Sequence, residues 1–227
     1  MFKAYNERKV LNPATTLAQM IDVLADLPLV YHPGISWEYS VATDVMARLI
    51  EAISGQRFDK FIQSRIFGPL GMVDTAFVVP EKDRGRLTAY YAGADLVEPM
   101  KPGLSRTDDS PYPDAYLRPV PRLNGGGGLV STLPDMVALI RSLLPGGSSL
   151  LKPATMALMM TNQLPDGMWI RFPIVGELRG RGFGLAGALI SYQSLRRSTT
   201  GMRWVNSFGE DMPAHSGGFR HGQMSRA

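Results

Sequence analysis

Residues 28–77 read PLVYHPGISWEYSVATDVMARLIEAISGQRFDKFIQSRIFGPLGMVDTAF, and this stretch decides the fold. Pro33-Gly34 is a turn signal, and the aromatic-rich segment after it ends at Tyr39-Ser40. From Ser40 onward the spacing of apolar residues predicts a helix, with one apolar face formed by Val45, Leu49 and Ile53. The stretch therefore predicts a turn that presents a tyrosine just before a helix.

Further helices are predicted on both sides of this stretch. Upstream, residues 17–24 have helical spacing after a cap at Thr15 or Thr16. Downstream, residues 58–67 form a short helix that ends in a Gly-Pro-Leu-Gly segment. After the glycine run at 125–128, one helix is predicted from Ser131 or Thr132 with a proline in its first turn, and another from Pro153.

Two regions depart from the helical pattern. Residues 80–122 are rich in Pro, Asp, Arg and Tyr, and they predict an irregular insertion with one short strand near Leu87–Ala92. From residue 165 on, Gly-spaced apolar residues predict strands of an antiparallel sheet, with Trp204-Val205 and Ala214–Phe219 among them. Helices thus dominate residues 1–160 and strands residues 165–227, which predicts an α+β fold.

Composition disfavours several classes of function. The net charge of +4 comes from scattered Arg and Lys, which favours a solvated face over nucleic-acid binding. The absence of cysteine excludes disulfides, a thiolate nucleophile and Cys-ligated metals. The spacing of His32, His215 and His221 does not support a zinc site, so neither a metal nor another cofactor is predicted.

The chain carries no segment that predicts membrane insertion. Its apolar runs are shorter than the roughly 20 residues that a membrane-spanning helix needs. The polar start MFKAYNERKV does not predict a signal peptide. The compartment stays open: cytoplasmic, or periplasmic or secreted for a chain that has lost an N-terminal segment.

Two side chains are candidates for proton transfer. Tyr39 lies between a Pro-Gly turn and a helix, and His215 lies in Ala-His-Ser-Gly-Gly on a predicted edge strand. Either can act as a general acid or base. A tyrosine in an aromatic-rich turn is more often a packed amphipathic side chain, and a histidine near a chain end is more often a surface or hydrogen-bonded core residue. Spacing alone therefore favours structural roles for both.

The order of the larger segments resembles that of class C β-lactamases, family VIII carboxylesterases and penicillin-binding proteins. Residues 28–77 resemble the second-motif region of these serine hydrolases, where a Pro-Gly turn leads to Tyr-Ser or Tyr-x-Asn, a helix and a PLGM-DT segment. The segments 125–132, 150–165 and 182–185 follow in register, and residues 215–219, His-Ser-Gly-Gly-Phe, resemble the third motif. The resemblance implies a β-lactamase/transpeptidase-like fold, with an antiparallel sheet flanked by a helical region.

The resemblance also implies roles for single residues. Tyr39 would shuttle protons between the leaving group and a Ser-x-x-Lys serine, whose lysine favours the tyrosinate. His215 would bind a substrate carboxylate or polarise the site. Ser216, Gly217 and Gly218 would bind substrate, with an oxyanion-hole N–H near Gly218 or Phe219.

The implied ligands are small esters, β-lactams or peptide-like molecules. Val41 stands where β-lactamases tend to have an asparagine that holds the amide of the substrate's side chain. Because valine cannot make that hydrogen bond through its side chain, ester recognition is favoured over recognition of penicillins.

The nucleophile motif is the main departure from the family pattern. Ser36 is the only serine before Tyr39, and its place after a Pro-Gly turn favours a turn or capping role. Ser149-Leu150-Leu151-Lys152 has the right spacing, but it follows the tyrosine, and Pro153 pushes Lys152 out of the helical region. We therefore expect residues 1–227 to be a partial β-lactamase-like domain, truncated at both ends and inactive alone.

Such a partial domain is expected to expose strand edges and apolar surface. It would be marginally stable, or form a homo-oligomer, unless a second polypeptide completes it. Two alternatives stay open. One is a non-catalytic module that binds peptide or acyl ligands with Tyr39, residues 80–122 and the His-Ser-Gly-Gly strand. The other is a gene fragment without a function of its own.

Overall fold

The computed structural model describes residues 2–93, 95, 101–106, 114–144, 146–147, 150–172, 176–185 and 187–190. Their contacts group them into two compact units. The first holds the described residues of Met1–Ser36 and Ser40–Met156, and the second those of Trp37–Tyr39 and Ala157–Ala227. The three residues that end at Tyr39 thus belong with the C-terminal part of the chain, although the helices on both sides of them belong to the first unit.

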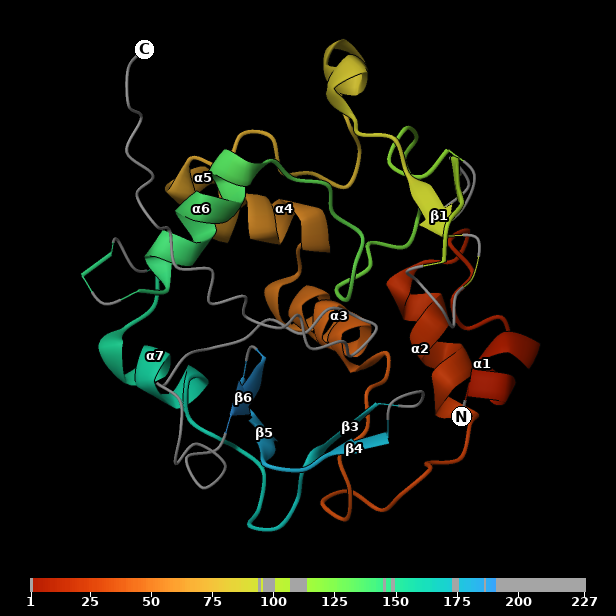
Figure 1. Cartoon of the computed structure of the whole chain (residues 1–227), viewed down its shortest axis with the longest axis vertical. Coiled ribbons are helices and arrows are strands. Elements are labelled where there is room, and N and C mark those ends of the chain that lie inside the picture. Colours follow the sequence, from red (N-terminus) through yellow and green to blue (C-terminus); the bar gives the residue numbers. More distant parts are fainter. Residues whose placement is uncertain are drawn as a thin grey trace, which may run out of the picture. The chain divides into compact units, whose positions relative to one another are not determined.

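Helical elements make up most of the ordered structure before residue 160 (Figure 1). They are α1 (Phe2–Glu7), α2 (Leu17–Ala25), α3 (Ala42–Ser54), α4 (Phe58–Ile62), the π-helical turn η1 (Gln63–Phe67), α5 (Gly68–Leu70), the 3-10 helix η2 (Glu81–Arg86), α6 (Leu133–Ser142) and α7 (Pro153–Met159). The strands are β1 (Tyr91–Gly93), β2 (Leu104–Arg106), β3 (Ile170–Phe172), β4 (Gly176–Leu178), β5 (Arg181–Phe183) and β6 (Ala188–Ile190). The fold is α+β, as the sequence predicted.

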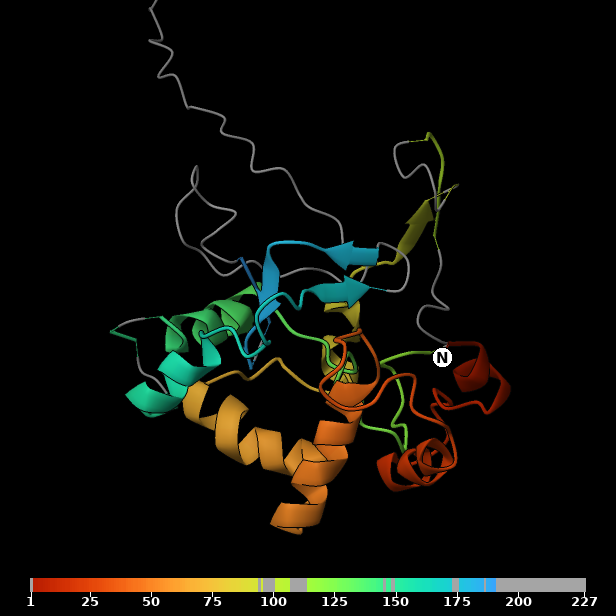
Figure 2. The same ribbon diagram turned by 90° about the horizontal axis from the view of Figure 1, so that it is seen from below.

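The described strands form three separate two-stranded antiparallel ladders: β1–β2, β3–β4 and β5–β6. Figure 2 shows β3 and β4 side by side. The sequence predicted strands of one sheet, and the described residues give these small ladders instead. The strand expected near Leu87–Ala92 lies at β1, where it pairs with β2, and η2 was not predicted. Two further predicted strands, 204–205 and 214–219, lie outside the described residues.

Local signals explain where α2 and α3 begin and end. Thr16 caps α2 through a capping box: its hydroxyl accepts the Gln19 N–H at 3.2 Å, and its own N–H donates to the Gln19 side chain at 2.9 Å. Helix α3 ends at Gly55, whose φ of 66° is a left-handed cap that glycine adopts without strain. Both helices lie where helical periodicity predicted them.

The path from α4 to α5 is one continuous helical run with a π-turn in it. The run passes through η1 into α5 and ends at Gly71, whose φ is 68°. Pro69 lies in the first turn of α5, and a proline there has no N–H to leave unpaired. The helix predicted over residues 58–67 therefore extends through most of the Gly-Pro-Leu-Gly segment.

The core of the first unit joins the N-terminal helices to the segment around residue 123. Helix α3 contacts both α2 and α4. Arg122 is buried at 5% exposure, and its guanidinium donates to the C=O of Val10 at 3.0 Å. The buried apolar side chains of this core are Val10, Leu17, Met20, Ala47, Phe58, Ile62, Phe67, Met72 and Leu123.

Candidate functional site

Tyr39 lies against strand β3 in the second unit. Its backbone N–H donates to the C=O of Arg171 at 3.0 Å, so the chain runs alongside the strand at this point. Its ring stacks on Phe172 with 5.5 Å between centroids and 28° between planes. The side chain remains 37% exposed. The backbone and one ring face of Tyr39 are therefore fixed, while part of the side chain stays open to solvent.

Trp37 anchors the same segment two residues earlier. Its ring meets Phe172 edge-on at 6.0 Å and packs against Phe183 of β5 at 4.9 Å. Ile170, which is fully buried, and Phe172 form the centre of this cluster. Aromatic pairs of this kind contribute about 0.5–1.5 kcal/mol each beyond the area they bury. The cluster holds the segment 37–39 in place, so the packing role expected of an aromatic-rich turn is observed.

Asn162 positions the strand that carries Phe183. Its side-chain oxygen accepts the N–H groups of Phe183 at 3.0 Å and Leu164 at 3.2 Å. A Cβ on Gly182 would lie 2.2 Å from that oxygen, so a larger residue here would displace the Asn162 amide and its two hydrogen bonds. This accounts for the first glycine of the Gly-Phe-Gly-Leu segment that the sequence singled out.

The other predicted site residues lie outside the described residues: His215, Ser216, Gly217 and Gly218, together with Phe219. Their roles stay predictions. Ser149 also lies outside, but Lys152 does not, and α7 begins directly after it at Pro153, as expected. Lys152 is therefore outside the helix, although its C=O accepts the N–H of Met156 at 3.0 Å.

Asp44, in the first turn of α3, holds the glycine run that the sequence placed in register with the family. Its carboxylate is 7% exposed and accepts the N–H of Gly125 at 2.8 Å and that of Gly126 at 3.3 Å. A Cβ on Gly125 would lie 2.3 Å from the C=O of Thr43. Gly125 is thus needed for the close backbone contact with α3.

Asp135, in the first turn of α6, binds Asp74-Thr75, the pair that follows α5, as Asp44 binds the glycine run. It is 4% exposed and accepts the Asp74 N–H at 2.8 Å and the Thr75 hydroxyl at 2.7 Å. Ser131 lies 2.8 Å from the same hydroxyl, and Ala76 pairs with Val130 in an antiparallel bridge. Sequence reasoning missed both Asp44 and Asp135, although an acidic residue in the first turn of a helix is a usable signal.

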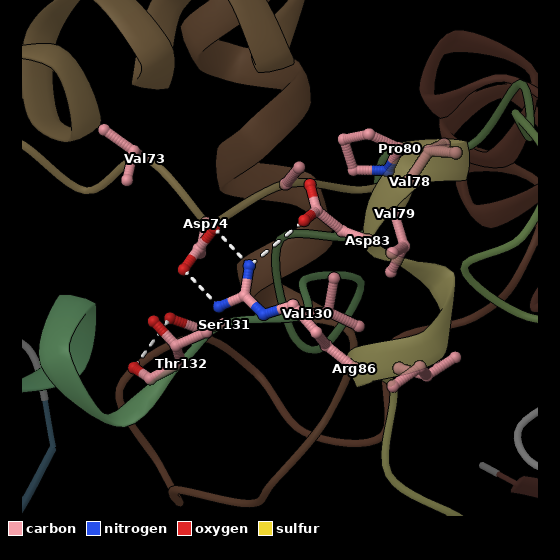
Figure 3. Close-up of a pocket in the computed structure, with 12 residues that line it drawn as sticks. Val73, Asp74, Val78, Val79, Pro80, Asp83, Arg86, Val130, Ser131 and Thr132 are labelled. Atoms are coloured by element: carbon pink, nitrogen blue, oxygen red, sulfur yellow. Dashed lines mark hydrogen bonds and ion pairs between the residues drawn. The ribbon is translucent and has the colours of Figure 1, made fainter.

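A small cavity of about 90 Å³ lies beside this junction (Figure 3). Arg86 of η2 spans it, pairing with both oxygens of Asp74 at 2.7 and 3.0 Å and with Asp83 at 3.2 Å. Valines and other apolar residues form most of the remaining wall. Because these charged groups satisfy one another, the cavity offers no unpaired cation to an anionic ligand.

The ion pair beside the cavity predicts a pH effect. Hydrogen bonds from Arg86 hold the pKa of Asp74 below its ordinary value. A carboxyl with a lowered pKa stabilises the fold above its unfolded pKa of about 3.9, and this stability is lost as the pH falls through the folded pKa. We expect Arg86→Gln to raise the pKa of Asp74 towards its ordinary value, as measured by carboxyl carbon NMR titration. Replacing the exposed Arg118 with Gln should leave it unchanged, and an equal rise in both variants would contradict this assignment.

The described residues contain no group of three or more His, Asp or Glu side chains placed to hold a metal ion. Among the same residues, no helix is both long and apolar enough to cross a bilayer.

Comparison with known proteins places these features in a family. The family profile described as Beta-lactamase matches residues 2–221. A protein of Mycobacterium tuberculosis is 31% identical over 191 residues, which cover 82% of this chain and 45% of that protein. The lovastatin esterase of Penicillium rubens is 34% identical over 67% of this chain and 37% of its own length.

Among solved structures, EstCE1, a hydrolase with promiscuous acyltransferase activity, aligns with a TM-score of 0.61 and 25% identity. The alignment covers 80% of this chain and 48% of EstCE1. The chain thus spans less than half the length of the relatives it matches here. The observed fold is of the serine β-lactamase/transpeptidase-like type, and the chain belongs to the beta-lactamase family.

Proposed function

We propose that residues 1–227 form part of a serine hydrolase that cleaves small carboxylic esters through an acyl-enzyme. The observation that carries the proposal is the placement of Tyr39, which β3 and Phe172 fix while its side chain stays partly exposed. A general base needs both properties: a fixed position and access to the reacting groups. The lovastatin esterase of Penicillium rubens, a relative by sequence, supports an ester as the substrate.

The proposed mechanism assigns Tyr39 two proton transfers. As a tyrosinate stabilised by a lysine, it takes the proton from the serine that attacks the ester carbonyl, and it then gives that proton to the departing alkoxide. Water then attacks the acyl carbon of the acyl-enzyme, and Tyr39 takes its proton. The serine oxygen departs and receives that proton from Tyr39, which releases the carboxylic acid. His215 and the segment Ser216–Gly218 bind the substrate, with a backbone N–H on the developing oxyanion. Val41, which carries no side-chain amide, favours esters over penicillin-type substrates.

The nucleophile is proposed to come from outside residues 1–227. The sequence holds one Ser-x-x-Lys, at 149–152, and its lysine stands before the first residue of α7, Pro153. We expect the purified 227-residue chain to show no hydrolysis of p-nitrophenyl butyrate above background. Intact mass after treatment with a fluorophosphonate should show no adduct. Turnover together with an adduct on Ser149 would refute the proposal that the nucleophile is external.

The role of Tyr39 is tested in the assembled enzyme, with a Ser-x-x-Lys polypeptide present. We expect Tyr39→Phe to lower kcat about 10²–10⁴-fold with little change in KM, because phenylalanine preserves ring stacking but cannot transfer a proton. Tyr31→Phe, an exposed tyrosine of the same segment, is the matched control and should keep full activity. Ligand binding that occurs without any turnover in the assembled protein would favour a non-catalytic binding module.

A further inference from the structure

Asn162 lies between α7 and β3, and its side chain bonds to the edge of strand β5. The amide oxygen accepts the N–H of Phe183 at 3.0 Å. The backbone N–H of the next residue, Gln163, donates to the C=O of Phe183 at 2.8 Å. Both backbone polar groups of Phe183 are therefore bonded to residues 162–163.

The other edge of β5 belongs to β6. Phe183 lies opposite Ala188 in this ladder, and the next residue, Gly184, donates its N–H to the C=O of Gly187 at 2.8 Å. In an antiparallel pair the backbone groups of successive residues point to opposite edges, so those of Phe183 point away from β6. The Asn162 oxygen thus takes the place of a backbone carbonyl from a neighbouring strand.

Further contacts fix the direction of the Asn162 amide. Its oxygen also accepts the Leu164 N–H at 3.2 Å, and its amino group donates to the Leu164 C=O at 3.2 Å. Such bonds from an asparagine to the backbone two residues on form a local turn. Gly182 leaves room for the amide on the other side, since a Cβ there would lie 2.2 Å from the oxygen. The acceptor of the Phe183 N–H is therefore held in one place.

The ring of Phe183 links this strand edge to the segment that ends at Tyr39. Phe183 packs against Trp37 with 4.9 Å between centroids, and Trp37 meets Phe172 at 6.0 Å. Tyr39 stacks on the same Phe172 at 5.5 Å. All these residues, with Asn162, belong to the second unit. Because the N–H of Tyr39 fixes only its backbone, the packing of these rings sets the direction of its side chain.

We propose that Asn162 is a positioning residue for Tyr39. It acts through Phe183 and Trp37, and it affects the reaction only through the position of the phenol. This inference rests on the proposed function, because a reacting phenol needs an exact position and a packed one does not. Without the Asn162 oxygen, water becomes the partner of the Phe183 N–H, and β5 is no longer held at a fixed distance from residues 162–164.

The first test is fluorine NMR of the 227-residue chain labelled with fluorotyrosine. The Tyr39→Phe variant identifies the Tyr39 signal, and Phe172→Leu gives the position of that signal without ring stacking. We expect Asn162→Ala to move the Tyr39 signal towards its position in Phe172→Leu. Because Asn162 is exposed, its replacement removes no side chain from the core.

Gln163→Ala is the matched control for this shift. The Gln163 side chain donates to the C=O groups of Leu158 and Thr161, and its backbone bond to Phe183 survives the substitution. The Tyr39 signal should therefore stay in place. A signal that does not move in Asn162→Ala, or that moves equally in the control, overturns the proposal.

Gly182→Ala disturbs the same oxygen from the other side. Its added Cβ displaces the Asn162 amide, so the Tyr39 signal should move in the same direction as in Asn162→Ala. Because both changes act on one hydrogen bond, the double variant should move the signal no further than Asn162→Ala does. Gly187→Ala should have no effect, since no atom lies within 4 Å of its added Cβ. Additive shifts in the double variant would mean that Gly182 and Asn162 act on Tyr39 by separate routes, against the proposal.

Kinetics of the assembled enzyme separate positioning from substrate binding. We expect Asn162→Ala to lower kcat for p-nitrophenyl butyrate about tenfold or more with KM unchanged, because a displaced general base hardly alters ground-state binding. Asn162→Asp should recover most of the loss, since a carboxylate oxygen can still accept both N–H groups. A change confined to KM, or equal kcat in Asn162→Ala and Gln163→Ala, contradicts a positioning role.

The outcomes for positioning and for catalysis are separable. If Asn162→Ala moves the Tyr39 signal but the assembled protein hydrolyses no ester, the link from Asn162 to Tyr39 stands and the proposed function fails. If the assembled protein hydrolyses esters and depends on Tyr39, but Asn162→Ala changes neither the signal nor kcat, the proposed function stands and Asn162 has no part in it.

Discussion

Gly125→Ala is expected to destabilise the chain by about 3 kcal/mol or more, the largest effect of any substitution considered. The added Cβ would lie 2.3 Å from the C=O of Thr43 and 3.0 Å from the Cβ of Ala47. Both are parts of α3 close to its axis, so neither can move aside as a flexible side chain could. The glycine run would have to separate from the helix and lose the hydrogen bonds to Asp44.

Urea unfolding followed by circular dichroism measures this loss. Gly85→Ala is the matched control, because no atom lies within 4 Å of the position of its added Cβ. The control should be neutral or gain up to about 1 kcal/mol from reduced freedom of the unfolded chain. If Gly125→Ala does not fold, the milder Thr43→Ser and Asp44→Asn variants report on the same contact. Equal stability of Gly125→Ala and Gly85→Ala would show that the close approach does not exist in solution.

Asp135→Ala is expected to cost about 3 kcal/mol. The carboxylate accepts two hydrogen bonds at a site where both Asp135 and Thr75 are buried. Hydrogen bonds to charged groups contribute about 1.5–3 kcal/mol each, and donors left without an acceptor add a desolvation cost. The substitution removes the acceptor from the Asp74 N–H and leaves the Thr75 hydroxyl with Ser131 alone.

The same unfolding measurement applies, with Asp22→Ala as its control. Asp22 is an exposed aspartate in α2, so its loss should change stability by less than about 0.5 kcal/mol. Asp135→Asn should lie between the two, because an amide oxygen in the place of Oδ2 can still accept both bonds but carries no charge. If Asp135→Ala and Asp22→Ala cost the same, Asp135 does not join the Asp-Thr pair to α6.

The helices were predictable because their signals are local. The capping box of Thr16 and Gln19 spans four residues. Gly55 ends α3 by adopting a left-handed φ, and Pro153 is the first residue of α7. The part of α3 that faces the core was not predictable, because its apolar positions span a broad arc. The structure buries Ala47 in the core and leaves Leu49 and Ile53 exposed. The three ladders pair strands that are neighbours in the sequence, but each strand has only three residues, which is too short for an alternating apolar pattern to predict.

The candidate site was predictable only in part. The order of segments pointed to Tyr39, and the structure places that residue on β3. The aromatic support from Phe172 and Phe183 was not foreseen, since it joins segments more than 130 positions apart. The roles of Asp44 and Asp135 were not predicted for the same reason, because their partners lie 81–82 and 60–61 positions away. The predicted roles of His215 and of Ser216–Gly218 stay untested.

The hydrogen bond from Arg122 to Val10 can form only late during synthesis of the chain on the ribosome. The two residues are 112 positions apart. Because a ribosome adds about 5–20 residues per second, about 6–22 s pass between the synthesis of Val10 and that of Arg122. During that interval helix α3, whose Val45, Leu49 and Ile53 are exposed, has already emerged next to a core that is not yet closed. Long-range contacts form slowly, and exposed apolar surface promotes aggregation in the meantime. Yield in a heterologous host should therefore depend more on chaperone supply and growth temperature than on expression level.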